Sequence, residues 1–208
     1  MPTRLTLYNA ALRHLGERRL SSLTESREPR RVLDNIWDNA FVNRVLQQGQ
    51  WKHARRTLKI DYSTTITPSF GYRYAFAKPA DCVRLMELCS DEFMQVPLLR
   101  YRDSPSYWLA DLTEIYVGFV SDDDGFGGDL SKWPANFTAY AELEMAVLAC
   151  PRLENSASDL ATLKMDRTKM LDDALSTDAQ TEPTRFPPIG NWAASRLSRS
   201  SSRRYNRA

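Results

Sequence analysis

The chain has 208 residues, of which 42% are hydrophobic and 26% charged, a balance typical of one well-packed domain or a domain with an insert. No apolar run reaches the roughly 18 to 20 residues that a membrane-spanning helix needs, and the N-terminal residues lack the apolar segment of a secretion signal. These features indicate a protein that is made in the cytosol and does not enter a membrane. The three cysteines include no CxxC pair and are odd in number, so we expect buried thiols rather than disulfides.

The formal net charge of +2 conceals an uneven distribution of charge along the chain. Six arginines and no acidic residue follow Glu182, so residues 1–182 hold 22 basic and 26 acidic side chains, a net charge of −4. The final residues, SRLSRSSSRRYNRA, are too polar and too rich in serine to form a core. We therefore expect this tail to be disordered when the protein is alone in solution.

Apolar residues at spacings of three and four predict two helices near the N-terminus. The first covers residues 3–15 and ends at Gly16, which suits a left-handed C-terminal cap. The second begins near Arg27, accepts Pro29 in its first turn and is expected to continue for about five turns to Gly49. The two apolar stripes consist of Leu5, Tyr8, Ala11, Leu12 and Leu15, and of Val32, Leu33, Ile36, Trp37, Ala40, Phe41 and Val45.

Between residues 57 and 120 the pattern changes to short runs rich in β-branched and aromatic residues. Five runs predict an antiparallel β insert: TLKIDYST, YRYAFA, RLMELC, FMQVPLL and EIYVGFV. Within this insert, KPADCVRL predicts one helical turn that begins at Pro79. The acidic and glycine-rich residues 121–129 predict a loop.

Helical spacing returns in the C-terminal third of the chain. One helix is expected to have Pro134 in its first turn and to close at Pro151, and a second is expected to cover residues 156–175. The fold class is therefore predicted as α+β and mainly helical, an antiparallel bundle of two helix pairs with an inserted antiparallel β region and an extended tail. The predicted domains are a helical bundle of residues 1–56 and 129–177, a β insert of residues 57–128 and an extended basic arm of residues 178–208.

Few side chains in the sequence suit catalysis or the binding of a cofactor. His14 and His53 stand at no metal-ligand spacing, and the P-loop, GxSxG and paired Cys/His signatures are missing. The carboxylates of residues 122–129 lack the alternation and the closing glutamate of a calcium-binding EF-hand loop. The sequence thus predicts no enzyme, no cofactor and no metal, and it favours a flexible acidic loop that a partner orders.

The N-terminal pair of helices also differs from a DNA-reading helix-turn-helix. Its connection, residues 17–27, is longer than the three or four residues that set a reading helix in the major groove. Acidic and basic side chains mix on the second helix, so no continuous basic face is presented to phosphates. The pair is therefore interpreted as structural.

Loose motifs over most of residues 5–175 carry a resemblance to a known family. The N-terminal motif consists of Asn9, Leu12, Gly16, Glu17, Leu23, Glu25, Arg31, Leu33, Ile36, Gly49 and Trp51. The later motifs are YAFAKPADCVRL at residues 74–85 and the helix start formed by Trp133, Pro134, Phe137 and Tyr140. Together they resemble the head-to-tail adaptor proteins of bacteriophages, the tail tubular protein A family and related head-completion proteins.

This resemblance implies a structural protein of the virion, located at the junction of head and tail. Members of that family form twelve-fold rings below the portal protein, continue its channel and provide the platform to which a tail nozzle or tail attaches. The implied partners are thus further copies of the chain, the portal and a tail protein, while DNA passes through the channel without specific binding. A net charge of −4 over residues 1–182 is consistent with a channel that does not retain DNA.

Two segments are predicted to meet the partners of such a ring. The basic arm, with apolar residues between its arginines, is expected to bind the portal, and the acidic loop is expected to meet the distal partner. The predicted arm residues are Arg185, Phe186, Ile189, Trp192, Arg196, Leu197, Arg199, Arg203, Arg204 and Tyr205, and the predicted loop residues are Asp122, Asp123, Asp124 and Phe126.

An alternative function remains open at this point. A nucleic-acid-binding accessory protein would use the arginine-rich tail for phosphate contacts and Tyr205 for stacking on bases.

Overall fold

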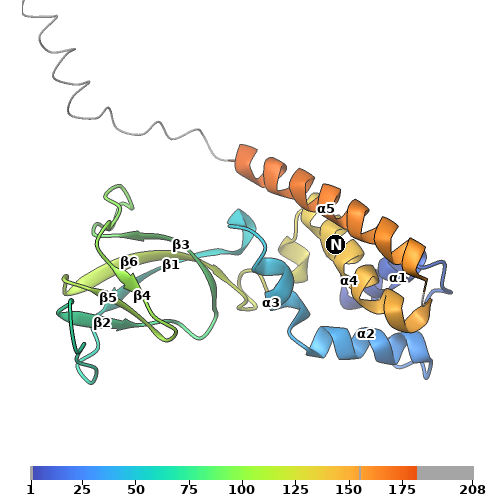
Figure 1. Ribbon diagram of the computed structural model, residues 1–208, viewed down its shortest axis with the longest axis horizontal. Helices are drawn as coiled ribbons and strands as arrows, with labels where there is room; N and C mark the ends of the chain where they lie inside the picture. The colour runs from blue at the N-terminus through green and yellow to red at the C-terminus, as the bar shows by residue number, and fades with distance from the viewer. Residues whose placement is uncertain (1, 155, 182–208) are drawn as a thin grey trace, which may run out of the picture.

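The computed structural model describes residues 2–154 and 156–181, which form a helical region and a β region joined end to end (Figure 1). The helical region takes its elements from both ends of the described chain, and the β region takes its strands from the middle. The helices are α1 (Arg4–His14), α2 (Glu28–Asp38), α3 (Phe41–Leu46), α4 (Ala135–Leu153) and α5 (Ala157–Gln180), with short 3-10 turns η1 (Lys52–Ala54) and η2 (Leu130–Lys132). The strands are β1 (Arg55–Asp61), β2 (Tyr74–Ala77), β3 (Cys82–Cys89), β4 (Arg102–Asp103), β5 (Tyr107–Ala110) and β6 (Glu114–Ser121).

The expectation of a mainly helical bundle is wrong. About 43% of the described residues are helical and 19% lie in strands, and these strands form two three-stranded antiparallel sheets in the orders β1-β6-β3 and β2-β5-β4. The physical reason is that the β region has a core of its own, which does not depend on the helices. Phe76, Trp108 and Phe119 are buried in this second core, and full burial of each such side chain stabilises the fold by roughly 1.5 to 3 kcal/mol.

α4 is the centre of the helical region. It packs against α1 and α2 on one side and against α5 on the other, as Figure 1 shows with α5 above α4 and α2 below it. Leu12, Phe41, Trp51 and Phe137 are almost fully buried in the core that these helices share. The core is therefore assembled from segments far apart in the sequence.

The ends of α1 are determined by local sequence, as predicted at Gly16. The Thr3 side chain accepts a hydrogen bond from the Thr6 amide, and the Thr6 hydroxyl accepts one from the Thr3 amide. Gly16 adopts a φ of 67°, and the Glu17 amide donates to the Leu12 carbonyl over 2.9 Å. This closure satisfies carbonyls at the helix end and favours glycine, which lacks a β-carbon.

The expected continuous helix from residue 28 to Gly49 is interrupted. α2 ends at Asp38, Ala40 takes the left-handed conformation with a φ of 57°, and α3 then runs only to Leu46. The break changes the direction of the chain so that Phe41, Val45 and Leu46 enter the core. Gly49 has a different role from a cap, because a β-carbon there would lie 2.7 Å from Leu175 and 2.8 Å from the Trp51 ring.

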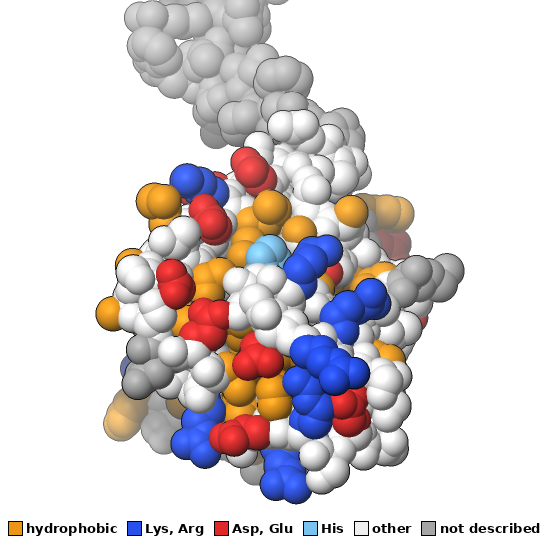
Figure 2. Space-filling view, turned by 90° about the vertical axis from the view of Figure 1, so that its right-hand side faces the viewer, with side chains coloured by type: hydrophobic (Ala, Val, Ile, Leu, Met, Phe, Trp, Pro, Cys, Tyr) orange, Lys and Arg blue, Asp and Glu red, His pale blue; other side chains and the backbone are white. Residues whose placement is uncertain are grey.

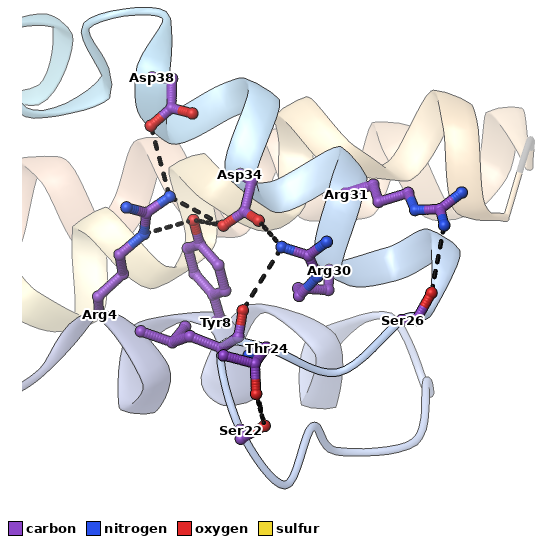
Figure 3. Close-up of polar contacts among 10 residues, drawn as sticks. Arg4, Tyr8, Ser22, Thr24, Ser26, Arg30, Arg31, Asp34 and Asp38 are labelled. Atoms are coloured by element: carbon purple, nitrogen blue, oxygen red, sulfur yellow. Dashed lines mark hydrogen bonds and ion pairs between the residues drawn. The ribbon is translucent and has the colours of Figure 1, made fainter.

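A polar cluster joins α1 to α2 (Figure 3). Asp34 accepts hydrogen bonds from the Tyr8 hydroxyl over 2.9 Å and from Arg4 over 2.8 Å, and it forms an ion pair with Arg30. Burial raises the pKa of the Tyr8 hydroxyl, which keeps it a donor. In Figure 3, Arg4 and Arg30 turn toward Asp34, whereas Arg31 reaches away from the cluster to the Ser26 hydroxyl.

Four of the five predicted strand runs contain strands of the β region, and two local predictions within it are wrong. FMQVPLL is a loop, in which only Pro97 forms an isolated bridge with Cys89, because the carboxylate of Asp91 accepts amide hydrogen bonds from Gln95 and Val96. KPADCVRL contains no helical turn: the Cys82 amide closes a turn to the Pro79 carbonyl, and β3 begins there. β4, RD, and β5, YWLA, lie in none of the predicted runs.

The C-terminal helices are longer than predicted. α4 continues past Pro151 to Leu153, and the absence of a proline N–H there removes only one hydrogen bond in the last turn. Pro134 precedes the helix as its N-cap rather than lying in its first turn. α5 begins after Ser156, whose side chain accepts a hydrogen bond from the Asp159 amide, and continues to Gln180.

Candidate partner-binding surface

The long loops of the β region leave it at the end that is remote from the helices. Asp61 at the end of β1 pairs with Glu114, and Cys89 at the end of β3 pairs with Tyr116, so both strands end beside the start of β6. The other end of β6, at Ser121, adjoins the helical region (Figure 1). Both loops, residues 62–73 and 90–101, therefore begin at the far end of the molecule, and the first part of the second loop turns back over the sheet (Figure 1), where Met94 lies beside Gly118.

Exposed apolar side chains are concentrated in these two loops. Leu99 is 93% exposed, Phe70 is 89% exposed and Phe93 is 73% exposed. Six of the eight large hydrophobic side chains exposed among the described residues belong to the loops, a concentration that marks a binding surface more than scattered single residues do. We call these six the far-end surface: Tyr62, Phe70, Phe93, Val96, Leu99 and Tyr101.

Internal hydrogen bonds shape the loop that carries Phe93 and Val96. The Asp91 carboxylate accepts from the Val96 amide over 2.7 Å and from the Gln95 amide over 3.0 Å. These backbone donors hold the pKa of Asp91 below its usual value. The loop presents its apolar side chains from a defined backbone.

Arg100 brings the two loops together. Its guanidinium lies 3.5 Å from the Gly71 carbonyl, 5.8 Å from the centre of the Tyr72 ring and 3.4 Å from the Asp111 carboxylate. Leu99 and Phe70, the neighbours of these residues in sequence, consequently lie in adjacent segments. Within the described residues Arg73 and Arg102 have no ion pair, so exposed guanidinium groups accompany the apolar side chains. Aromatic residues together with arginine are the combination enriched at protein interfaces.

The acidic loop lies elsewhere than the far end. Asp122 accepts a hydrogen bond of 3.3 Å from Asn43 on α3, and its amide donates to the Asp81 carbonyl at the start of β3. Asp123 lies 3.7 Å from Arg56, and the Arg56 guanidinium lies over the ring of Phe126. Four predicted residues, Asp122, Asp123, Asp124 and Phe126, thus belong to the junction between the two regions.

Close packing defines the path of this acidic loop. A β-carbon at Gly127 would lie 2.5 Å from the Ser121 carbonyl, 2.7 Å from Leu46 and 2.9 Å from Ala54. The buried indole of Trp133 donates to the Gly127 carbonyl over 2.8 Å. The loop that was expected to be flexible is held by contacts within the chain, and binding of a partner there stays a prediction.

The carboxylate of Asp81 reinforces the junction between the helical region and the β region. Burial opposes ionisation of Asp81, but hydrogen bonds from Ser121 and Arg56 outweigh it and hold the pKa of Asp81 below its usual value. The ionised carboxylate ties β1, β3 and β6 together at the edge next to the helices. Its contacts are those of a structural group.

His53 at the same junction has an unusual environment. Its ring lies 4.6 Å from the Phe137 ring and 6.2 Å from the Trp51 ring, and both ring nitrogens are buried without a hydrogen-bond partner. Burial lowers the pKa of His53 to about 4, so the imidazole is neutral at physiological pH.

The three cysteines differ in their burial. Cys89 and Cys150 are buried as expected, whereas Cys82 is only half-buried, and burial raises its pKa to about 11. No group of three or more His, Cys, Asp or Glu side chains could hold a metal ion in the part of the chain that the structure describes.

The predicted arm residues, Arg185 to Tyr205, lie outside the described residues. The described chain ends at Thr181, after the last turn of α5. There the Lys52 ammonium donates to the carbonyls of Asp178 and Ala179 over 2.6 and 3.1 Å. The described chain therefore ends beside the junction.

Comparison of the chain with protein-family models and with the curated proteins found no match. Among helices in residues 2–154 and 156–181, none is both long and apolar enough to cross a membrane.

The far-end surface was not predicted, because four of its six members lie in runs that were expected to be strands and the other two lie in no predicted element. Phe93 and Val96 lie in FMQVPLL, which reads as a strand by composition, and Phe70 received no assignment. Two local signals favour a loop: Asp91 before the run, and Pro97 within it. An apolar run that lacks alternation and adjoins such residues is typical of a loop with exposed apolar side chains as well as of a strand.

Proposed function

We propose that the chain is the subunit of a bacteriophage head-to-tail adaptor, in which residues 182–208 hold the portal protein and the far-end surface meets a tail protein. The observation that carries this proposal is the exposed far-end surface, at the end of the molecule opposite the helical region. A protein with a binding surface at one end and a basic segment that leaves elsewhere is suited to bridge two partners.

The basic arm has the length that such a bridge needs. About 25 extended residues reach roughly 80 Å, enough to cross to a neighbouring ring. Each charge pair with an acidic surface contributes about 0.2 to 1 kcal/mol, but repeated copies in a ring act together. The described body stops at Thr181, so the arm can be removed without deleting any element of the two cores.

The geometry favours protein recognition over catalysis at the far-end surface. Its members are aliphatic and aromatic, and the Asp91 carboxylate beside them is engaged by backbone amides. A leucine and a phenylalanine that are 93% and 89% exposed gain by burial against another surface.

The test uses two variants and two binding measurements. Deletion of residues 183–208 is expected to abolish capture of the portal protein of the same phage while leaving binding to its purified tails. Phe70→Ser combined with Leu99→Ser is expected to do the reverse, because both side chains are exposed and neither supports a core. Full portal binding by the deletion variant, or full tail binding by the double variant, would contradict the corresponding half of the proposal.

A further inference from the structure

Opposite sides of the helical region carry opposite charge. Residues 2–54 hold nine basic and five acidic side chains, a net charge of +4, and residues 129–181 hold five basic and nine acidic side chains, a net charge of −4. Figure 2, which faces the helical end of the molecule, shows acidic side chains mainly on one side of a hydrophobic band and basic side chains mainly on the other. The two halves of the sequence thus give the region an electrostatic polarity.

Internal ion pairs do not neutralise this polarity. Arg4 and Arg30 form ion pairs with Asp34, and Arg44 forms an ion pair with Glu144. In the helical part of the described residues, the basic N-terminal segment keeps three arginines without an ion pair, and the acidic C-terminal segment keeps four carboxylates and one lysine. The unpaired groups are Arg18, Arg19 and Arg31 on the first side, and Glu154, Asp159, Asp172, Asp173 and Lys164 on the second.

A groove of mixed polarity lies between α2 and α4. It has a volume of about 590 Å³, with Val32, Ile36 and Leu148 among its lining residues. Glu28, Arg31, Asn35 and Arg152 complete its lining, and Arg152 forms an ion pair of 2.9 Å with Glu28. The basic tail of the chain is a poor occupant, because its arginines would meet the unpaired Arg31 guanidinium.

The outer face of α5 complements this groove in both polarity and charge. Met165 is 55% exposed there, and Asp172, seven positions later, shares its face of the helix. Leu163 and Ala174, which are buried, mark the opposite face, toward α4. α5 therefore offers an exposed apolar side chain with unpaired carboxylates on its own helix.

We infer that the α5 face of one copy packs against the α2 side of the next copy, with Met165 in the groove between α2 and α4 and the α5 carboxylates facing Arg18, Arg19 and Arg31. Such a contact joins two different surfaces and therefore repeats from copy to copy, as a closed ring requires. This inference rests on the proposed function, for which it supplies the contact between neighbouring subunits.

Charge reversal tests the contact on the full chain by sedimentation velocity at low ionic strength. Asp172→Arg with Asp173→Arg, and separately Arg18→Glu with Arg31→Glu, are each expected to weaken self-association by at least about tenfold. Met165→Lys is expected to weaken it as well, because the added ammonium would meet the Arg31 guanidinium at the groove. Arg102→Glu, at the far end, is the matched control and is expected to associate as the wild type does.

Restoration distinguishes the contact from a general effect of charge. A chain with all four reversals, or an equal mixture of the two double variants, brings opposite charges together again and is expected to recover association. Wild-type protein that stays monomeric at every concentration, or reversals that leave association unchanged or are not rescued in combination, would overturn the inference. Capture of the portal by a monomeric wild type would leave the proposed function standing, and rescued association without portal capture would remove the proposed function alone.

Discussion

Glu144 on α4 accepts a hydrogen bond of 2.8 Å from the Nε of Arg44 on α3, although 100 positions separate the two residues. Glu144 is only 5% exposed, and its second carboxylate oxygen lies 3.5 Å from Nε of Arg167 on α5. That second contact is an ion pair without hydrogen-bond geometry. One buried carboxylate thereby holds a helix on each side of α4.

Removal of this carboxylate is expected to destabilise the protein more than removal of either arginine. Glu144→Ala leaves the partly buried guanidinium of Arg167 without its counter-ion and should lower the free energy of unfolding by about 3 kcal/mol. The side chain of Arg44 is 56% exposed, so Arg44→Ala should lower it by only about 1 kcal/mol. Urea unfolding measures both, with exposed Glu154→Ala as control; equal effects of Glu144→Ala and the control would refute the role.

Stability should depend on pH through His53. Because burial holds its folded pKa near 4, below the unfolded value of about 6.5, the unfolded state binds more protons between these limits. The contribution of neutral His53 to the free energy of unfolding is therefore complete above pH 6.5. It falls by an amount on the order of 2 to 3 kcal/mol as the pH is lowered toward 4. His53→Phe, which also removes two unpartnered nitrogens, should flatten the dependence of unfolding free energy on pH across this window. An unchanged pH profile in that variant would assign the dependence to other groups.

Gly127→Ala should loosen the junction of the two regions. The added methyl group would clash with a backbone carbonyl and with two packed side chains, and overpacking of this kind costs about 1 to 3 kcal/mol. Gly125→Ala is the control, because its β-carbon would meet only the Asp123 carboxylate at 3.2 Å. Thermal unfolding and the summed near-ultraviolet circular dichroism of the tryptophans would report the change. Equal melting temperatures for the two variants would argue against close packing at Gly127.

Binding to DNA separates the proposed adaptor from the nucleic-acid-binding alternative. An adaptor that lets DNA pass should give no shift of unrelated duplex DNA at physiological salt. If the six arginines after residue 182 bind phosphates, the logarithm of affinity should fall against the logarithm of salt concentration with a slope approaching about −5. A steep slope that disappears on deletion of residues 183–208 would favour the alternative.

Local chemistry made some elements predictable and left others hidden. The spacing in α1 and its Gly16 cap were recognised because both depend on a few adjacent residues. The break at Ala40 was not, since that left-handed residue is imposed by packing of Phe41 and Leu46 rather than by its own type. The share of β structure in the fold was underestimated for the same reason, because the core of the β region forms only when strands far apart in the sequence meet.

The candidate surfaces likewise combine features that composition predicts with features that depend on the folded structure. Composition revealed the charge contrast between the tail and the rest of the chain, but the position of Asp122 to Phe126 depended on contacts with Asn43 and Arg56. Exposure of Phe70 and Leu99 is likewise a property of the folded loops, which no spacing rule reports.

The bond from Lys52 to the last carbonyls of α5 has a mechanical consequence. Any load applied to residues 182–208 enters the described structure at Thr181, close to the Asp178 and Ala179 carbonyls that this ammonium binds. Tension would pass along α5 into α4 and, by way of Lys52, directly into η1 and β1. A pull on the tail is thus shared between the helices and the sheets at its point of entry, instead of unwinding one helix from its end.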